Sequence, residues 1–423
     1  MDGYRRRIVD DELDELAPRL AALALEGPKA VGKTETALRR SATVYRLDDP
    51  VVAEIARADP SRLVAGARPV LIDEWQRFPP TWDVVRRAVD ADSTGGQFLL
   101  TGSATPPGAP THSGAGRIAT LRMRPLSLAE RDLGPVSVRL ADLLSGSRPQ
   151  LHGESTLRVA DYAYEVVASG FPGLRGLSGR ALRSALDGYL HRIVEHDIDE
   201  LGARVRNPGA LRRWMTAYAA ATSSTAAFET IRDAASAGDS TPARSTTIPY
   251  RRILEQLWII EDLPAWLPSR NRLRRLGESP RHHLADPALA ARLLGVDADT
   301  LLDGADPGHL VPRDGSLLGA LFESLVALSV RVYGQADEAT VSHLRTRGGE
   351  HEVDLIVERS DGRVVALEVK LSRSVSDTDV RHLTWLAGQL GDGLLDAAVI
   401  TTGPEAYRRG DGIAVIPAGL LGP

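Results

Sequence analysis

The sequence predicts an α/β protein with a parallel sheet in its first third, a helical middle and a second α/β domain at its end. Three observations carry this prediction. A glycine-rich loop near residue 30 lies between an apolar run and a helix. Further apolar strands alternate with helices after it, which is typical of a parallel sheet. Near residue 360, two strands of alternating polarity flank a tight turn. The expected segments are 1–145, 146–206, 207–290 and 291–423.

The glycine-rich loop has the spacing of a phosphate-binding loop. It reads G-x-x-x-x-G-K-T, after the apolar run 21–25 and before an expected helix over 35–40. Glycines let several backbone N–H groups face one hollow, which suits a phosphate chain at the start of a helix. Lys33 is expected to reach the β and γ phosphates of ATP, and Thr34 to hold Mg²⁺. The predicted nucleotide-binding residues here are Gly27, Pro28, Lys29, Ala30, Val31, Gly32, Lys33 and Thr34.

The use of lysine supports this interpretation. Of 51 basic residues, only Lys29, Lys33 and Lys370 are lysines. The chain uses arginine almost everywhere that a positive charge is needed, so lysine marks sites where the two are not interchangeable. Two of these sites lie in the loop.

The next apolar strands end in polar residues that suit ATP hydrolysis. A strand over 43–47 comes first, and the strand over 68–74 ends in Asp73 and Glu74, the Walker B pattern. Asp73 is expected to orient Mg²⁺, and Glu74 to polarise the attacking water. The strand over 97–103 offers Thr101 or Ser103 as a polar sensor of the γ phosphate. All these residues fall at strand carboxyl ends, where parallel sheets bind ligands.

A Pro/Gly/Ser/Thr-rich loop over 105–116 leads into the last strand of this domain, near 117–126. Three arginines lie near that strand. Arg117 is the candidate arginine finger for the γ phosphate. The alternative is that these arginines are solvated residues at the strand ends.

The middle of the chain predicts helices and a winged helix. His191, Glu195, His196 and Asp197 crowd one helix, where a solvated surface is favoured over a metal site. Short helices are expected over 211–222, 226–237 and 246–257. The segment 258–263 after them could open the β-wing of a winged helix. The third of these helices with a basic wing suggests DNA binding, and packing between domains is the alternative. The basic residues of the wing are Arg270, Arg272, Arg274, Arg275, Arg281, His282 and His283.

The end of the chain predicts an αβββαβ order. An apolar helix over 318–326 carries a single acid, Glu323, and strands over 340–346, 351–357 and 364–370 follow. Alternation places Glu368 and Lys370 on one face, with Asp354 able to lie opposite them. The arrangement resembles the PD-(D/E)xK nuclease core. That resemblance implies that Asp354 and Glu368 bind Mg²⁺, that Glu323 is an outer ligand and that Lys370 positions the water. A catalytically retired site remains open.

The whole chain resembles prokaryotic AAA-type ATPases that have a C-terminal domain of unknown function related to those nucleases. The stretches that carry the resemblance are 26–34, 71–76, 99–104, 170–172 and 352–370. It implies ATP binding and hydrolysis. We expect the nucleotide state to control a module that binds, or also cuts, DNA. The alternative is a nucleotide-dependent switch or scaffold for a protein partner with an inactive nuclease fold. A metabolic kinase is disfavoured, because Asp73 and Glu74 suit water activation.

Composition and charge restrict which classes of protein this chain can belong to. The 423 residues carry a net charge of −5, so nucleic-acid binding requires a local basic patch. With no cysteine, disulfides and thiolate zinc sites are excluded. No signal peptide is recognisable, and no stretch is expected to approach the ~20 apolar residues of a membrane span. A cytoplasmic protein without membrane contact is expected, and the sequence leaves its oligomeric state open.

Overall fold

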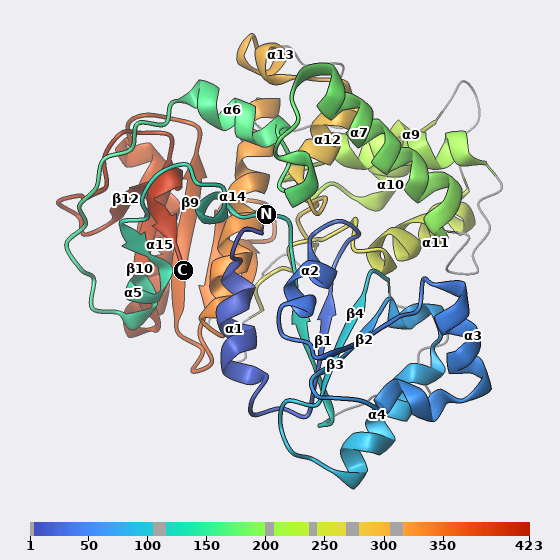
Figure 1. Ribbon diagram of the computed structural model, residues 1–423. Coiled ribbons are helices and arrows are strands. Elements are labelled where there is room, and N and C mark those ends of the chain that lie inside the picture. The colour runs from blue at the N-terminus through green and yellow to red at the C-terminus, as the bar shows by residue number, and fades with distance from the viewer. Residues whose placement is uncertain (1–3, 105–115, 199–206, 237–242, 268–278, 305–315) are drawn as a thin grey trace.

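The computed structural model describes residues 4–104, 116–198, 207–236, 243–267, 279–304 and 316–423. Figure 1 shows the N-terminal sheet at the lower right, the C-terminal sheet at the left and a helical region above the first. Two helices lie side by side between the sheets, α1 (Ile8–Leu16) and α14 (Leu317–Ala336). The two sheets are therefore joined through packed helices as well as through the chain.

The N-terminal domain contains a parallel sheet, as the sequence predicts. Its five strands have the order β2-β3-β4-β1-β5. The strands are β1 (Ala22–Glu26), β2 (Thr43–Arg46), β3 (Val70–Asp73), β4 (Phe98–Gly102) and β5 (Ile118–Arg122). The helices are α2 (Lys33–Leu38), α3 (Pro50–Ala58) and α4 (Pro80–Ala91), with 3₁₀ turns at Pro60–Val64 and Trp75–Arg77.

The central strands of this sheet are apolar on both faces. Leu23 and Leu99 belong to the core on one side, whereas Ala22 and Phe98 belong to the core on the other. Strands covered on both faces read as continuous apolar runs, which explains their strong sequence signal. Asp73 lies opposite Thr101 in the register of β3 and β4, so their polar ends meet at one sheet edge.

The middle of the chain is helical. Its helices are α5 (Leu140–Ser145), α6 (Val159–Val167), α7 (Gly179–Arg192), α9 (Pro208–Ala220), α10 (Phe228–Ala234), α11 (Arg244–Gln256), α12 (Pro287–Leu294) and α13 (Ala298–Leu302). A π-helical turn, Ile193–Asp197, extends α7. After α11, residues 259–263 and 281–285 run antiparallel, with isolated bridges between Ile260 and Leu284 and between Leu263 and Arg281. We call this pair of segments the bridge ladder.

The three helices and the bridge ladder follow the order expected of a winged helix, whose assignment stays a prediction. One part of that expectation is wrong. Arg281, His282 and His283 are buried, because the ladder packs against the C-terminal domain. They are therefore not an exposed basic wing. The other wing arginines, Arg270, Arg272, Arg274 and Arg275, lie outside the described residues.

The C-terminal domain has the predicted αβββαβ order. After α14 come β7 (Thr340–Arg345), β8 (Glu352–Glu358), β9 (Val364–Lys370), α15 (Asp377–Leu390) and β10 (Leu394–Thr401). The additional strands are β11 (Tyr407–Arg408) and β12 (Ala414–Pro417), and the mixed sheet has the order β11-β12-β10-β9-β8-β7. The short strands β6 (Val138–Arg139) and β13 (Leu421–Gly422) pair with each other. The order of elements does not by itself assign the nuclease fold, which stays a prediction.

Helix α14 is the longest helix among the described residues and the centre of the main core. By length and a mean hydropathy of 1.5 it is apolar enough to cross a membrane, so the expectation that no stretch approaches such a span is not met. Within the fold, 72% of its most apolar window is buried. That burial is typical of a core helix, since residues of α1, the middle helices and the C-terminal sheet belong to the same cluster.

Candidate functional site

The phosphate-binding loop connects β1 to α2 in a tight turn. An added Cβ at Gly27 would lie 2.1 Å from the carbonyl oxygen of Met123, so only glycine fits there. Gly32, with φ of 102°, and Ala30, with φ of 67°, adopt the left-handed backbone that orients successive N–H groups inward. The loop therefore has the backbone form that its sequence motif predicts.

Lys33 is buried and folded back onto its own loop. Its Nζ donates hydrogen bonds of 2.8 Å to the carbonyl oxygens of Gly27 and Pro28. Burial lowers the pKa of Lys33 to about 8, and the charge of Glu74 only partly offsets this. A buried ammonium whose hydrogen-bond acceptors are neutral carbonyls favours an anionic ligand.

Asp73 is held by two hydroxyl groups at the carboxyl edge of the sheet. Thr34 Oγ1 donates to Asp73 Oδ1 at 2.8 Å, and Thr101 Oγ1 donates to the same oxygen. A hydroxyl beside a carboxylate is the pair of oxygen ligands that a P-loop uses for Mg²⁺, so these residues fit that ion.

Glu74 is held separately, in a left-handed conformation with φ of 55°. Its Oε2 accepts hydrogen bonds from Gln76 Nε2 at 2.6 Å and from Ser103 Oγ at 3.1 Å. Of the two hydroxyls considered as a sensor, Thr101 thus serves Asp73 and Ser103 serves Glu74. Gln76 was not among the predicted site residues. Its position two residues after Glu74 is the sequence signal that could have identified it.

A cavity of about 420 Å³ opens beside the loop. Val31, Gly32 and Thr36 contribute to it from the loop and α2. Tyr4 closes one side, with its Oη 2.9 Å from Thr36 Oγ1 and 2.6 Å from Asp10 Oδ2. The cavity is large enough for a base and sugar next to the phosphate hollow. Its other lining residues are Arg5, Arg7, Glu35, Met123, Leu126, Pro172 and Arg175.

The loop also contacts the helical region. Lys29 Nζ lies 2.6 Å from Asp197 Oδ1 in the π-helical turn, and Tyr189 Oη donates to the Lys29 carbonyl oxygen at 3.2 Å. Asp197 is therefore part of this contact, whereas His191, Glu195 and His196 are exposed. The surface interpretation of that helix holds for these three residues.

The arginine finger prediction needs a correction. Arg117 precedes β5, which runs parallel to β1, so it lies at the sheet edge opposite the loop and pairs with Asp90 at 2.8 Å. Five residues of strand separate it from the loop edge, about 16 Å. Arg122, at the other end of β5, lies level with Glu26. This is the arginine of the strand that the fold brings near Lys33, whose pKa its charge lowers.

The second predicted site lies in the C-terminal domain. Continuing the register of Leu355 opposite Leu367 places Asp354 level with Glu368 on the neighbouring strand. Asp354 Oδ2 accepts the Val369 N–H at 2.8 Å, and Lys370 Nζ donates to Glu368 Oε1 at 2.8 Å. The other oxygen of Glu368, Oε2, is buried without a hydrogen-bond partner. Burial and the charge of Asp354 raise the pKa of Glu368.

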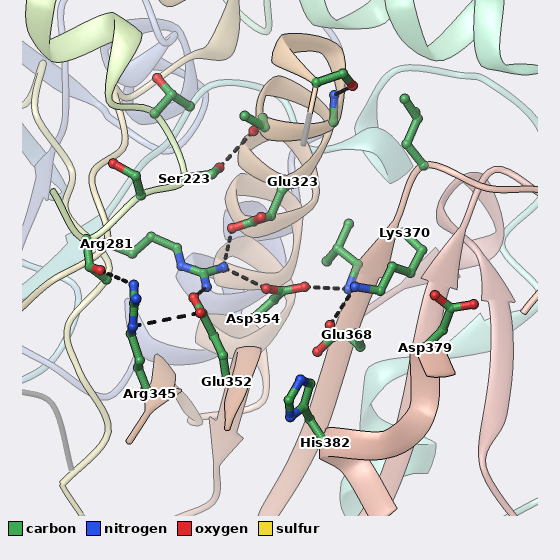
Figure 2. A pocket seen from close by; sticks show the side chains of 18 of the residues that line it. Ser223, Arg281, Glu323, Arg345, Glu352, Asp354, Glu368, Lys370, Asp379 and His382 are labelled. Carbon is green, nitrogen blue, oxygen red and sulfur yellow. Dashed lines mark hydrogen bonds and ion pairs between the residues drawn. The ribbon is translucent and has the colours of Figure 1, made fainter. Parts of the chain in front are cut away.

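Arg281 of the bridge ladder completes this cluster. The sequence predicted it in an exposed basic wing and not beside these carboxylates. Its Nη1 donates to Asp354 Oδ1 at 2.7 Å and to Glu323, and its Nη2 donates to Glu352 (Figure 2). Glu323 comes from α14, and burial and the Asp354 charge raise its pKa. The cluster lines a cavity of about 810 Å³ that also carries hydroxyl and basic side chains, among them Thr222, Ser223, Ser224, Thr225, Arg345, Arg381 and His382.

The carboxylates of this second site do not form a metal site as they stand. Across the described ranges, no three His, Asp or Glu side chains are arranged to hold an ion. Asp354 and Glu323 face the Arg281 guanidinium instead. The metal role of Glu323, Asp354 and Glu368 therefore stays a prediction.

Three family models match separate parts of the chain and together cover most of it. Residues 20–131 match the model of an AAA domain. That match agrees with the loop, the Walker B edge and the parallel sheet. The N-terminal domain is a parallel-sheet domain of the P-loop NTPase-like kind. Residues 159–300 and 318–421 each match a domain of unknown function, DUF8612 and DUF4143.

The similar whole proteins assign no activity to this chain. Uncharacterized proteins of Mycobacterium bovis and Mycobacterium tuberculosis are each 25% identical over 421 residues, which is 98% of this chain and 83% of theirs. Among solved structures, a Walker-type ATPase of Pyrococcus abyssi is similar over 67% of this chain and 94% of its own, with 16% identity and a TM-score of 0.40. A likeness at this level carries no argument about function.

Proposed function

We propose that the N-terminal domain binds ATP with Mg²⁺ and hydrolyses it, and that the nucleotide state controls the C-terminal module. The observation that carries the hydrolysis proposal is the state of Lys33. Among the described residues, this buried ammonium donates to two acceptors, the carbonyl oxygens of Gly27 and Pro28. A polyphosphate would exchange those carbonyls for charged oxygens, which bind an ammonium more strongly.

Each residue around the loop has a separate role in the proposed hydrolysis. Lys33 would neutralise the β and γ phosphates, and Thr34 with Asp73 would hold Mg²⁺, which supplies positive charge against the developing phosphate charge. Glu74, fixed by Gln76 and Ser103, would accept the proton of the attacking water. The 420 Å³ cavity at Tyr4 would take the base and sugar.

The test compares two variants of the full chain. Lys33→Ala is expected to lose nucleotide binding and at least about 100-fold of its ATP turnover, because an electrostatic contact to the transferring phosphate is removed. Glu74→Gln is expected to keep ATP affinity within a few-fold and to lose turnover. Wild-type turnover in Lys33→Ala would contradict the proposal. Equal loss of affinity in both variants would contradict the role of Glu74.

A second function, phosphodiester cleavage in the C-terminal cavity, is favoured by one observation. Glu368 Oε2 is a buried carboxylate oxygen without a partner, beside Asp354 and Lys370 in a cavity lined by hydroxyl and basic residues. Buried polar atoms usually have partners, so an orphaned one at a cavity wall points to a ligand. DNA is the substrate class that we propose for this cavity.

Cleavage of labelled single- and double-stranded DNA, with and without ATP, tests this function. Loss of cutting in Lys370→Ala would support it, and dependence on ATP would show that the two sites are coupled. DNA binding should weaken steeply with salt, because phosphate contacts release counterions. An intact ATPase that neither cuts nor binds DNA would favour the alternative, a nucleotide-dependent switch that binds a protein partner.

A further inference from the structure

We propose that Arg281 is an internal cation that closes the C-terminal acidic site, so that Arg281 and a divalent metal ion exclude one another. The inference rests on the proposed function of that cavity and adds its regulation. It starts from the three carboxylates that hold one guanidinium. The Arg281 guanidinium lies between α14 and β8, bonded to Glu323, Glu352 and Asp354 (Figure 2).

The competition is for particular lone pairs. Asp354 Oδ2 accepts the Val369 N–H at 2.8 Å, which uses one lone pair of that oxygen, and Oδ1 is turned toward Arg281. Arg281 Nη1 holds that Oδ1 at 2.7 Å and also holds Glu323. A metal ion that takes Asp354 and Glu323 as ligands must therefore displace the guanidinium.

The charge of Arg281 is permanent. A guanidinium stays protonated at any pH that the protein survives, whereas a lysine in the same place could give up its proton. The side chain is 3% exposed, so solvent screens its charge little. A divalent ion within a few ångströms would meet a full positive charge in a weakly screened site. Withdrawal of Arg281 is thus a condition for metal binding.

The hydrogen-bond network around Arg281 leaves some of its buried polar atoms unpaired. Arg281 Nε and Glu368 Oε2 are both buried without partners. A buried polar cluster that served only stability would leave few such atoms, since each costs free energy. The unsatisfied atoms are those that another arrangement, with Arg281 withdrawn and an ion at Glu368, would satisfy.

The segment that carries Arg281 can transmit its position to the nucleotide domain. Arg281 exchanges backbone hydrogen bonds of 2.8 and 2.9 Å with Leu263 in the bridge ladder. Two residues along, the carboxylate of Glu261 binds Arg124 at 2.6 Å and lies 3.6 Å from Arg122, which ends β5 beside the phosphate loop. One short ladder therefore holds both the closing cation and an anchor to the nucleotide domain.

The test measures Mn²⁺ binding to the nucleotide-free full chain by electron paramagnetic resonance and calorimetry. Arg281→Gln is expected to bind Mn²⁺ at least about tenfold more tightly than the wild type, because a buried like charge is removed. Adding Asp354→Asn should abolish the gain, which assigns it to this site. Arg408→Gln is the matched control, since it breaks a buried ion pair with Asp396 in the same domain away from the cavity. It should leave Mn²⁺ binding unchanged.

Each outcome separates the closing role from the proposed function. Equal Mn²⁺ affinity in wild type and Arg281→Gln overturns the closing role, as does the absence of binding in both. Tighter binding without DNA cutting supports the closing role and removes the cleavage function. If Arg281→Gln fails to fold, hydrogen exchange of the wild type decides. Millimolar Mn²⁺ should then speed exchange in residues 281–285, and unchanged exchange overturns the inference.

Discussion

The two sites of this molecule hold buried cations in opposite ways. Within the described part of the chain, the hydrogen-bond acceptors of Lys33 are two neutral carbonyls, whereas Arg281 is surrounded by three carboxylates. The first arrangement leaves a positive charge in need of an anion, and the second leaves carboxylates already neutralised. Under our two proposals, the N-terminal site is ready for its ligand, whereas the C-terminal site must first be opened.

Replacing each cation by an apolar residue of similar size tests this difference most directly and should give the largest effect. Arg281→Met is expected to destabilise the nucleotide-free protein by about 3–5 kcal/mol, because it leaves buried carboxylates unpaired. Lys33→Met should cost little or be stabilising, since it removes a buried charge whose hydrogen-bond acceptors are neutral carbonyls. The melting temperatures of both variants at neutral pH measure this. Similar losses would show that the two cations are held alike.

Loosening the anchor of the bridge ladder is expected to have the next largest effect. Glu261 is 10% exposed and lies among Arg122, Arg124 and Arg331, whose charges hold its pKa well below the usual range although desolvation opposes them. Glu261→Gln should cost about 2–3 kcal/mol, because three buried guanidinium groups lose their counter-charge.

Hydrogen exchange at 281–285 is the measurement that reports the effect of Glu261→Gln on the ladder. It should become faster, while exchange in β9 stays as in the wild type. An unchanged ladder would show that Arg281 is positioned independently of the nucleotide domain.

Lowering the pH should weaken the packing around Arg281 specifically. Burial and the charge of Arg281 lower the pKa of His343 from its ordinary 6.5 to about 4. The unfolded chain therefore binds a proton that the folded chain refuses, and stability is lost as the pH falls from 6.5 toward 4. The loss at pH 5 should be about 2 kcal/mol.

The control for this pH effect is His343→Gln, which should flatten the stability profile between pH 6.5 and 5. Chemical unfolding at each pH is the measurement. A variant profile as steep as that of the wild type would assign the acid sensitivity to other groups, such as the buried His283, whose pKa is also lowered by burial.

The contact between the loop and the π-helical turn should give the smallest effect. Lys29 is 27% exposed and pairs with the buried Asp197. A double-mutant cycle with Lys29→Ala and Asp197→Asn is expected to give a coupling free energy of about 1 kcal/mol. The exposed pair of Arg19 and Glu15 serves as the control and should couple by less than about 0.5 kcal/mol. Equal coupling in both pairs would make the loop contact an ordinary surface ion pair.

Local patterns predicted the placement of the candidate side chains well where one segment supplies them. The loop over 27–34 and the acids at 73 and 74 depend on a strand, a turn and a helix that follow one another, so spacing is enough to find them. Arg117 was a wrong choice that strand direction could have prevented, because a residue before a parallel strand lies at the edge away from the loop.

The side chains that can carry chemistry are recognisable from the sequence alone: a P-loop lysine, two Walker B acids, and a hairpin with Asp354, Glu368 and Lys370. The groups that those side chains face follow from tertiary packing. Arg281 lies 42 residues before Glu323 and 73 before Asp354, and no periodicity links them. Their contact follows from helices and two sheets that pack into one core, and that packing sets which buried charges meet.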